Sequence, residues 1–323
     1  MPPPKSVTVG GIFRDAVRRF ERAALHYGHG THNARDDAAW LILHTLRLPL
    51  DDLRPHLKRV LTPVEQCRIA ALVERRVRER TPVAYLINEA WLGDYSFYVD
   101  SRVIIPRSFI AELARDGFEP WLRRPVRRAL DLCTGSGCLA VLLAKHFPAA
   151  RVDASDLSAA ALAVARRNVS RYRLGRRIRL VRSDLFAGLG GCRYDLIVSN
   201  PPYVKSSSMR TLPSEYRHEP HAALAGGADG LVLVRRILAE ARTHLEPGGL
   251  LVCEIGRNKR ALERTFPALP FVWLETSAGA EHVFLLERER LPLTKGASSC
   301  ARRASSRRAA PPAPPRARRT SRA

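Results

Sequence analysis

Apolar residues in the first part of the chain recur at the spacing of helices. Residues 38–46 form a largely apolar block, and Thr62 is followed by Pro63 and Glu65, as at a helix N-terminus that carries a capping box. Upstream, the apolar positions that lie three or four residues apart are Ile12, Phe13, Ala16, Val17 and Phe20. These patterns predict a small helical domain over residues 1–88.

The hydrophobic period changes after Trp91. Apolar residues then alternate with polar ones, or run together, on both sides of Asp100-Ser101; they are Tyr95, Phe97, Val99 and Val103 to Ile105. Alternation of this kind is typical of strands. We predict a β-hairpin linker over residues 89–107, with its turn at Asp100-Ser101.

Beyond residue 107, short apolar runs alternate with amphipathic segments. The predicted strands are Ala129–Leu132, a strand near Val152, Ile178–Val181, Leu196–Ser199 and Leu250–Glu254. Helices are predicted to begin at Cys138, Ala159 and Leu231. Strands that alternate with helices imply right-handed crossovers, so an α/β domain with a mainly parallel sheet is predicted over residues 108–290. Phe271–Leu274 and His282–Leu286 could close one edge as an antiparallel pair.

The chain is strongly basic, and much of the excess lies at its end. Its 323 residues carry a net charge of +23 with an ordinary hydrophobic fraction of 46%. From Lys295 to Ala323 there are one Lys and eight Arg and no acid, in a segment rich in Ala, Pro and Ser. We predict that residues 291–323 form a disordered basic tail. Such a tail attracts phosphate backbones and could make a weak RNA contact, or it could serve only as a solvated extension.

Several classes of protein are disfavoured by what the chain lacks. No apolar run approaches the ~18 residues that span a bilayer, and the first residues lack a signal-peptide core. The six cysteines form no C-x-x-C pair and no cluster with zinc spacing. We therefore expect a cytoplasmic protein with neither a membrane anchor nor a metal.

A glycine turn follows the first predicted strand of the α/β domain. Its candidate cofactor-binding residues are Asp131, Cys133, Thr134, Gly135, Ser136 and Gly137. Glycines let the backbone approach a ligand, and the N-terminus of the following helix offers free N–H groups. Since Gly135-x-Gly137-x-x-Ala140 also satisfies the dinucleotide fingerprint, a nicotinamide or flavin site remains open at this point.

Two aspartates end the next two predicted strands. Asp156 is placed to accept the hydroxyls of a ribose, although an acid at a helix N-terminus is the plainer alternative. Asp184 could bind an adenine amino group, with Leu185 and Phe186 packed on the ring; a simple turn aspartate is the alternative.

The tetrad Asn200-Pro201-Pro202-Tyr203 directly follows the predicted strand at 196–199 and is the candidate catalytic loop. Two prolines stiffen the loop and remove two backbone donors, so the loop presents acceptors. An amide nitrogen is a poor nucleophile because its lone pair is delocalised. If the Asn200 side-chain oxygen and the Pro201 carbonyl each accept one N–H, that lone pair turns toward a methyl donor, while Tyr203 packs on the planar group.

These motifs together resemble the HemK family of class I methyltransferases, which methylate glutamine side-chain amides in proteins of the translation machinery. The similarity covers about residues 10–288. Further matching segments are Thr81–Leu86, Trp91, Phe97–Val99, Ile105–Leu113, His218–Pro220 and Gly226–Leu231. The resemblance implies a Rossmann-like domain that uses S-adenosyl-L-methionine, preceded by a small helical domain and a connecting β-hairpin.

Two features are more similar to the ribosomal-protein branch (PrmB), which modifies large-subunit ribosomal protein 3, than to the release-factor branch. They are Cys133, where glycine is more usual, and Arg107-Ser108-Phe109. Carried over by position, the resemblance implies cofactor contacts from five residues and a glutamine held by residues 200–203. Those five are Gly135, Gly137, Asp156, Asp184 and Asn200. Arg107 and Glu112 could form an ion pair at the domain junction.

Four other functions compete with this interpretation. A DNA or RNA amino-methyltransferase uses the same tetrad, since exocyclic amines are also planar, but it predicts an added target-recognition domain. The small helical domain suits docking of a peptide or protein better. An NAD-dependent enzyme lacks a group in residues 200–203 that polarises a hydride acceptor, and a non-catalytic RNA-binding module would not need an intact cofactor loop. Only tests with purified substrates distinguish the release-factor branch from the ribosomal-protein branch.

Overall fold

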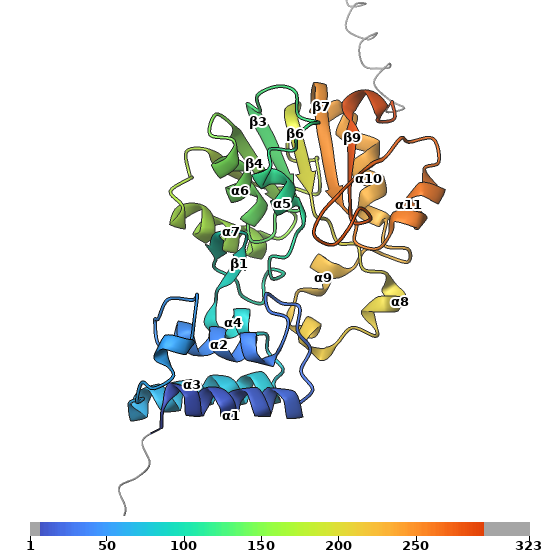
Figure 1. The fold of residues 1–323 in the computed structure, drawn as a ribbon. Coiled ribbons are helices and arrows are strands. Elements are labelled where there is room, and N and C mark those ends of the chain that lie inside the picture. Colours follow the sequence, from blue (N-terminus) through green and yellow to red (C-terminus); the bar gives the residue numbers. More distant parts are fainter. Residues whose placement is uncertain (1–6, 294–323) are drawn as a thin grey trace, which may run out of the picture. The chain divides into compact units, whose positions relative to one another are not determined.

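The computed structural model describes residues 7–293, and its centre is a seven-stranded sheet in the order β5-β4-β3-β6-β7-β9-β8 (Figure 1). The strands are β3 (Arg128–Leu132), β4 (Arg151–Asp156), β5 (Ile178–Arg182), β6 (Tyr194–Ser199), β7 (Leu245–Glu254), β8 (Val272–Leu274) and β9 (Val283–Glu287). β5, β4, β3, β6 and β7 run parallel, and β9 is antiparallel to both β7 and β8. The predicted parallel sheet with an antiparallel edge is therefore confirmed.

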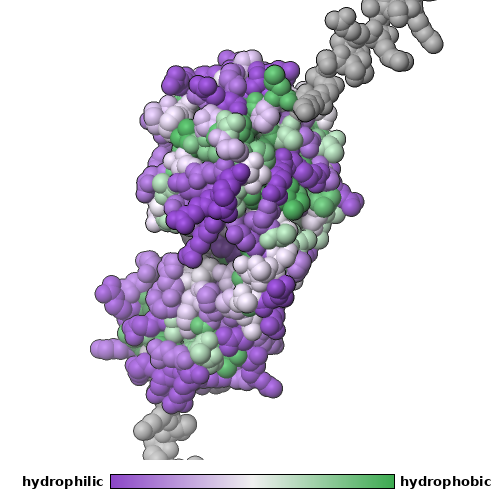
Figure 2. All heavy atoms as spheres, turned by 90° about the vertical axis from the view of Figure 1, so that its right-hand side faces the viewer, coloured by the Kyte–Doolittle hydropathy of each residue, from purple (hydrophilic) through white to green (hydrophobic). Residues whose placement is uncertain are grey.

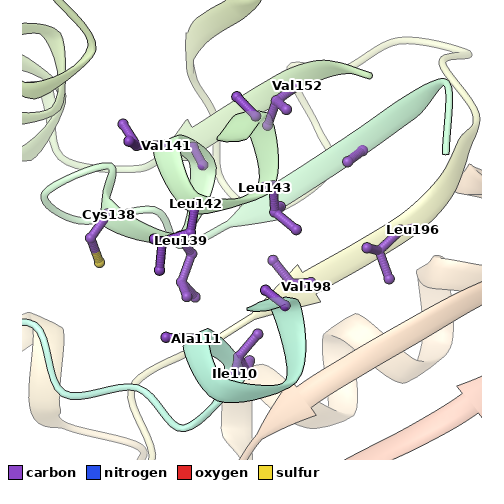
Figure 3. Close-up of a cluster of buried hydrophobic side chains, with 14 of the residues drawn as sticks. Ile110, Ala111, Cys138, Leu139, Val141, Leu142, Leu143, Val152, Leu196 and Val198 are labelled. Atoms are coloured by element: carbon purple, nitrogen blue, oxygen red, sulfur yellow. The ribbon is translucent and has the colours of Figure 1, made fainter. Parts of the chain in front are cut away.

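Helices cover both faces of this sheet because its strands are apolar on both faces. They include α5 (Ile110–Arg115), α6 (Cys138–His146), α7 (Ala159–Arg171), α10 (Val232–Glu240) and α11 (Lys259–Thr265). In β6, Leu196 and Val198 pack in one core cluster with α5 and α6, as Figure 3 shows, while Ile197 packs in the other with α10. Alternate residues of a strand point to opposite faces, so a continuous apolar run indicates burial on both sides.

The segment before the sheet is helical, as predicted. It comprises α1 (Val9–Arg22), α2 (Ala34–Thr45), the 3₁₀ turn η1 (Arg54–His56), α3 (Pro63–Arg78) and α4 (Val83–Ile87). These helices share a hydrophobic cluster of their own, built on Phe20, Leu41 and Ile69. The capping box that opens α3 is confirmed, because Glu65 N donates to Thr62 Oγ1 over 3.2 Å and Thr62 N donates to the Glu65 carboxylate over 2.9 Å.

A hairpin links the helices to the sheet, but its predicted turn is wrong. β1 (Ala90–Leu92) pairs with β2 (Tyr95–Phe97), so the turn lies at Gly93-Asp94 instead of Asp100-Ser101. Gly93 has a φ of +57°, a conformation that glycine adopts without strain. Val103 and Ile105 are buried but belong to no strand, so their apolar pattern results from burial and not from strand pairing.

The connection from β6 to α10 contains α8 (Ser206–Met209), η2 (Ser214–His218) and α9 (His221–Leu224). It meets the helical segment through buried charges. The fully buried Glu215 carboxylate accepts from the backbone N–H of His26 over 2.9 Å and pairs with Arg80 at 2.9 Å and Arg76 at 3.6 Å. Arg76, only 1% exposed, also donates to Asp37 over 2.9 Å. The negative charges of two carboxylates are thus balanced by the positive charges of two guanidinium groups.

The chain leaves the sheet through η3 (Ala241–His244) before β7 and η4 (Arg288–Arg290) after β9. Most of the predicted basic tail, residues 294–323, lies outside the described residues. Within residues 7–293, no helix has the length and apolar character needed to cross a bilayer.

The neighbouring residues Arg75 and Arg76 allow a direct test of the buried charge cluster. We expect Arg76→Ala to lower the free energy of unfolding by about 3–5 kcal/mol, because it leaves the buried Asp37 carboxylate without its cationic partner and removes one of the two cationic partners of Glu215. Arg75→Ala is the matched control: its half-exposed pair with Glu79 is worth under about 1 kcal/mol. Urea denaturation followed by circular dichroism measures both, and equal losses in the two variants would contradict a structural role for the cluster.

Candidate active site

The carboxyl ends of β3, β4 and β6 meet at a cavity of about 370 Å³. β4 and β6 lie on opposite sides of β3, so the chain connections diverge at this point, where open α/β sheets bind their ligands. The volume lies in the range of small-molecule sites. The predicted site residues that line the cavity are Cys133, Gly135, Asp156, Asp184, Leu185, Asn200 and Pro202.

The glycine turn presents one glycine to the cavity and buries the other. A Cβ atom at Gly135 would meet nothing within 4 Å, whereas one at Gly137 would lie 3.0 Å from the Cβ of Ala165. Gly135 thus leaves open space for a ligand, and Gly137 allows α6 to pack closely on α7. Cys133 has a φ of +63°, in the left-handed region where glycine is unstrained.

Asp131 and its neighbours support the turn from behind and do not line the cavity. Asp131 Oδ2 accepts from Thr134 Oγ1 over 2.5 Å and from the backbone N–H of Ala140 over 2.9 Å. Its Oδ1 is buried without a partner among residues 7–293, and burial raises the pKa of this carboxyl to about 7. Ser136 and Gly137 are likewise absent from the cavity lining. Direct cofactor contacts by Asp131, Thr134, Ser136 and Gly137 stay a prediction.

Asp156 stands at the rim of the cavity with its carboxylate fixed by the backbone. Oδ2 accepts from Gly135 N over 2.9 Å and Oδ1 from Ser158 N over 2.8 Å, while burial raises the pKa of the carboxyl. Each oxygen has a second lone pair for a ligand hydroxyl. Beside it, Ser155 lines the cavity, and its buried hydroxyl has no hydrogen-bond partner in the part of the chain that the structure describes. The sequence analysis missed this residue.

Asp184 and Leu185 line the cavity from the segment that follows β5. Asp184 is half exposed and pairs with Arg236 over 2.9 Å, and this hydrogen bond lowers the pKa of the carboxyl. Leu185 is buried and lines the cavity. Phe186 does not line the cavity: its ring stacks on His244 at 4.6 Å, inside the core cluster under α10, and its predicted packing on an adenine ring stays a prediction.

The Asn-Pro-Pro-Tyr loop separates this cavity from a second one of about 180 Å³. The second cavity is lined by all four loop residues, and the two cavities share Ile104, Asn200, Pro202 and Ala223. Asn200 therefore stands where they join. Within residues 7–293, its side chain has no hydrogen-bond partner, so the amide group is free to bind a ligand.

Tyr203 is held on the far side of the loop. Its hydroxyl lies 3.4 Å from Glu254 Oε1, and its carbonyl accepts from Asn258 Nδ2 over 2.9 Å. A Cβ at Gly256 would come within 2.6 Å of the Tyr203 ring, so the ring rests directly on bare backbone. Glu254 also accepts from Ser108 Oγ over 2.7 Å.

Glu254 is a second residue that the sequence analysis missed. It ends the apolar strand β7, it is 1% exposed, and burial raises the pKa of its carboxyl to about 7. A carboxylate at the carboxyl end of a buried strand was the available signal, since charged side chains are rarely buried without a specific partner.

The wall of the second cavity contains an ion pair that differs from the predicted one. Arg107 forms a bidentate pair with Glu219, with distances of 2.6 and 2.7 Å, and its guanidinium lies 5.5 Å from the ring of Tyr216. The predicted pair between Arg107 and Glu112 is wrong, because Glu112 instead accepts from the backbone and hydroxyl of Ser277.

The described residues contain no group of three or more His, Cys, Asp or Glu side chains that could hold a metal ion. What the site offers to a ligand is hydrogen-bond acceptors, a fixed carboxylate at Asp156 and apolar walls.

Comparison with known proteins gives the site its context. Residues 119–214 match the model of the methyltransferase small domain, and residues 14–87 match that of the PrmC N-terminal domain. A ribosomal protein uL3 glutamine methyltransferase of Neisseria meningitidis serogroup B is 56% identical over 286 residues, which cover 88% of this chain and 94% of that protein.

The relative from Burkholderia pseudomallei, with the same description, is 53% identical over 298 residues, which cover 90% of this chain and 97% of that protein. One from Bordetella pertussis is 52% identical over 286 residues, covering 88% of this chain and 96% of that protein. The resemblance to the HemK family and to its ribosomal-protein branch is therefore confirmed. The chain is a methyltransferase with a class I Rossmann-like domain, and it belongs to the family of the uL3 glutamine methyltransferases.

Proposed function

We propose that this chain transfers a methyl group from S-adenosyl-L-methionine to the side-chain amide nitrogen of a glutamine in large-subunit ribosomal protein 3, uL3. The observation that carries the proposal is the position of Asn200, whose uncommitted amide stands at the junction of two cavities. The larger cavity suits a nucleoside-containing cofactor and the smaller one a planar amide. The printed names of the close relatives supply the substrate.

The residues of the larger cavity fit a nucleoside. The Asp156 carboxylate has lone pairs free for ribose hydroxyls, and the Ser155 hydroxyl is a buried donor in need of an acceptor. Leu185 offers an apolar surface to a base, and Asp184 an acceptor for its amino group. The open space at Gly135 admits a ligand close to the backbone. When bound, S-adenosyl-L-methionine supplies an electrophilic methyl group on a sulfonium.

In the smaller cavity, the loop would orient the glutamine by its two N–H groups. Asn200 Oδ1 and the Pro201 carbonyl each accept one of them, and the two prolines offer no competing donors. Tyr203, clamped against Gly256 and Glu254, supports the planar amide. Hydrogen bonding of both protons turns the nitrogen lone pair toward the neighbouring cavity, and this positioning contributes most of the rate.

The transfer is a direct displacement. The bound cofactor would supply the methyl group, with its sulfur as the leaving group that keeps the electron pair of the S–C bond, and Asn200 with Pro201 would direct the nitrogen lone pair that forms the N–C bond. The methylated nitrogen then releases one proton to solvent, which restores the neutral amide. No strong base is required, because a positively charged amide nitrogen is strongly acidic.

A third cavity, of about 510 Å³, is suited to the polypeptide that flanks the glutamine. It connects the helical segment, through Gly28, Gly30 and His32, with Arg107 and Tyr203. In this proposal, residues 1–88 act as a docking domain, 89–107 as a linker and 108–290 as the catalytic domain. The reaction takes place in the cytoplasm, where ribosomal proteins are made.

The proposal is tested by transfer of labelled methyl to purified uL3, a class I release factor and unmodified ribosomal RNA, with mass mapping of the product. We expect one methyl on a glutamine of uL3. Asn200→Ala should lower kcat by roughly 10²-fold or more and change cofactor affinity by no more than a few fold, because it removes an orienting contact. Label on the release factor alone would overturn the substrate, and label on RNA would overturn the amide chemistry.

Asp156→Ala tests the ribose contact. Loss of hydrogen bonds to a charged acceptor costs about 1.5–3 kcal/mol, so we expect cofactor affinity to fall roughly 10- to 100-fold. Asp184→Ala is the control from the same cavity, and its half-exposed, Arg236-paired carboxylate should matter less. Isothermal titration calorimetry gives both affinities. An unchanged affinity in Asp156→Ala would remove Asp156 from this role.

The burial of the Glu254 carboxyl, which raises its pKa, predicts a pH dependence of stability. The folded carboxyl titrates at about 7 and its usual value is 4.5, so between these pH values the folded protein binds more protons than the unfolded chain. Stability contributed by this group is therefore present at low pH and falls as the pH rises through the window, on the order of 3 kcal/mol in total.

We expect Glu254→Gln to be as stable as the wild type near pH 5 and to lose less stability up to pH 7, as measured by urea denaturation at each pH. The exposed Glu281→Gln is the matched control and should follow the wild type. Parallel curves for Glu254→Gln and the wild type would show that Glu254 does not titrate in this window.

A further inference from the structure

Arginines gather at the amino ends of four neighbouring strands, at the edge of the sheet opposite the active site. Arg127 precedes β3, Arg151 opens β4, Arg176 and Arg177 precede β5, and Arg193 precedes β6. The active-site residues follow the carboxyl ends of the same strands.

The strand register sets these arginines in a row. Arg151 lies opposite Arg128 in the pairing of β4 with β3, and its backbone N–H donates to the carbonyl of Arg127 over 2.9 Å. On the other side, Val152 N donates to the carbonyl of Arg177 over 2.9 Å. Neighbouring strands lie about 4.8 Å apart, so Arg177, Arg151 and Arg128 form one row across β5, β4 and β3. Arg176, Arg127 and Arg193 lie within two residues of this row.

Most of this positive charge is uncompensated. The side chains of five exposed arginines have neither an ion pair nor a hydrogen bond within the described part of the chain. We call them the arginine edge: Arg123, Arg127, Arg151, Arg176 and Arg193. Their neighbours Arg124 and Arg128 already pair with Asp195 and Asp153, at 3.0 and 3.6 Å.

The two nearby carboxylates are committed inside the fold. Asp195 also accepts from the backbone N–H groups of Arg127 and Arg128, over 2.9 and 3.0 Å. Asp153 is held by Arg179 over 2.7 Å and by the hydroxyl of Tyr194 over 2.8 Å. Both acids are therefore already engaged by groups outside the arginine edge or by its backbone.

The chain also leaves the described structure at this edge. β9 is antiparallel to β7, with Glu287 opposite Leu250, so β9 ends where the parallel strands begin. In Figure 2 the upper end of the molecule, where β7 begins, is covered largely by hydrophilic side chains. The sequence that follows, residues 294–323, adds one Lys and eight Arg and no acid.

We propose that the arginine edge binds the sugar-phosphate backbone of RNA and leaves the active site, at the opposite edge of the sheet, free for its protein substrate. Exposed, uncommitted guanidinium groups that cluster along one edge of the sheet suit a polymer with a negative charge at every nucleotide. An acidic protein partner would need an apolar centre to its interface. Within residues 7–292, none of the bulky exposed apolar side chains lies at this edge; they are Val7, Val60, Val64, Trp91, Leu157 and Val232.

The test uses the full chain and a short fluorescein-labelled RNA hairpin, with anisotropy measured over a series of KCl concentrations. The edge variant carries Arg127→Gln, Arg151→Gln and Arg193→Gln. The control variant loses the same charge from exposed, unpaired arginines of the helical segment: Arg14→Gln, Arg22→Gln and Arg68→Gln. A third variant ends at Leu293.

We expect the edge variant to reduce the slope of log affinity against log salt by about 3, roughly one for each phosphate that is no longer neutralised, while the control keeps the wild-type slope. The chain that ends at Leu293 should bind more weakly than the full chain yet remain sensitive to the edge substitutions. Methyl transfer to isolated uL3 should be unchanged in the edge variant, which also shows that this variant is folded.

Equal losses in the edge and control variants would overturn the proposal, because binding would then follow net charge alone. An edge that binds polyglutamate but not the hairpin would overturn it in favour of an acidic protein. Insensitivity of the shortened chain to the edge substitutions would assign all RNA binding to residues 294–323.

Discussion

The buried carboxylate of Glu215 is the constraint on which the site depends. A fully buried charge is tolerated only beside opposite charges, and Arg76 and Arg80 of the helical segment provide them. The segment that contains Glu215 must therefore lie against the helices. Four residues later, the Glu219 carboxylate accepts hydrogen bonds from the Arg107 guanidinium and from the backbone N–H of Ile105. Both residues lie next to the smaller cavity. One cluster of charges thus couples helical packing to the shape of the proposed glutamine site.

The predictable parts of the structure are those set by neighbours in the sequence. Apolar runs identified the buried strands, and Thr62 with Glu65 identified the start of α3, because hydrophobic period and capping act within one turn or one strand. Ion-pair partners are set instead by which residues the fold brings together, even when they are distant in the sequence. Arg107 pairs with Glu219 and not with Glu112, which is only five residues away in the sequence. The folded backbone brings Glu219 into bidentate geometry and turns Glu112 toward Ser277.

The glycine turn shows why a motif alone does not assign roles. Gly135 faces the cavity and Gly137 faces Ala165, although the two glycines are two residues apart and equally prominent in the sequence. Asp131 is turned inward to hold Thr134 and Ala140, whereas Asp156 reaches the rim. Tight turns reverse side-chain directions within single residues, so the distinction between supporting and lining residues requires coordinates. The same holds for Phe186, which packs in the core under α10 and does not line the cavity.

The hydrogen bonds around the Asn-Pro-Pro-Tyr loop agree with the proposed mechanism of positioning rather than with proton abstraction. Just before Asn200, Ser199 Oγ donates to the Leu132 carbonyl over 2.8 Å. After it, the Tyr203 carbonyl is bound by Asn258, and the Val204 backbone N–H donates to Leu224 over 2.8 Å. Both flanks of the loop are therefore fixed, while the Asn200 amide itself is free. A neutral amide held in this way cannot act as a base at any physiological pH, but it can fix the direction of a weak nucleophile's lone pair. For a planar amide substrate, that direction is the property that limits reactivity, and it is the one that a rigid loop with two acceptors, Asn200 Oδ1 and the Pro201 carbonyl, controls.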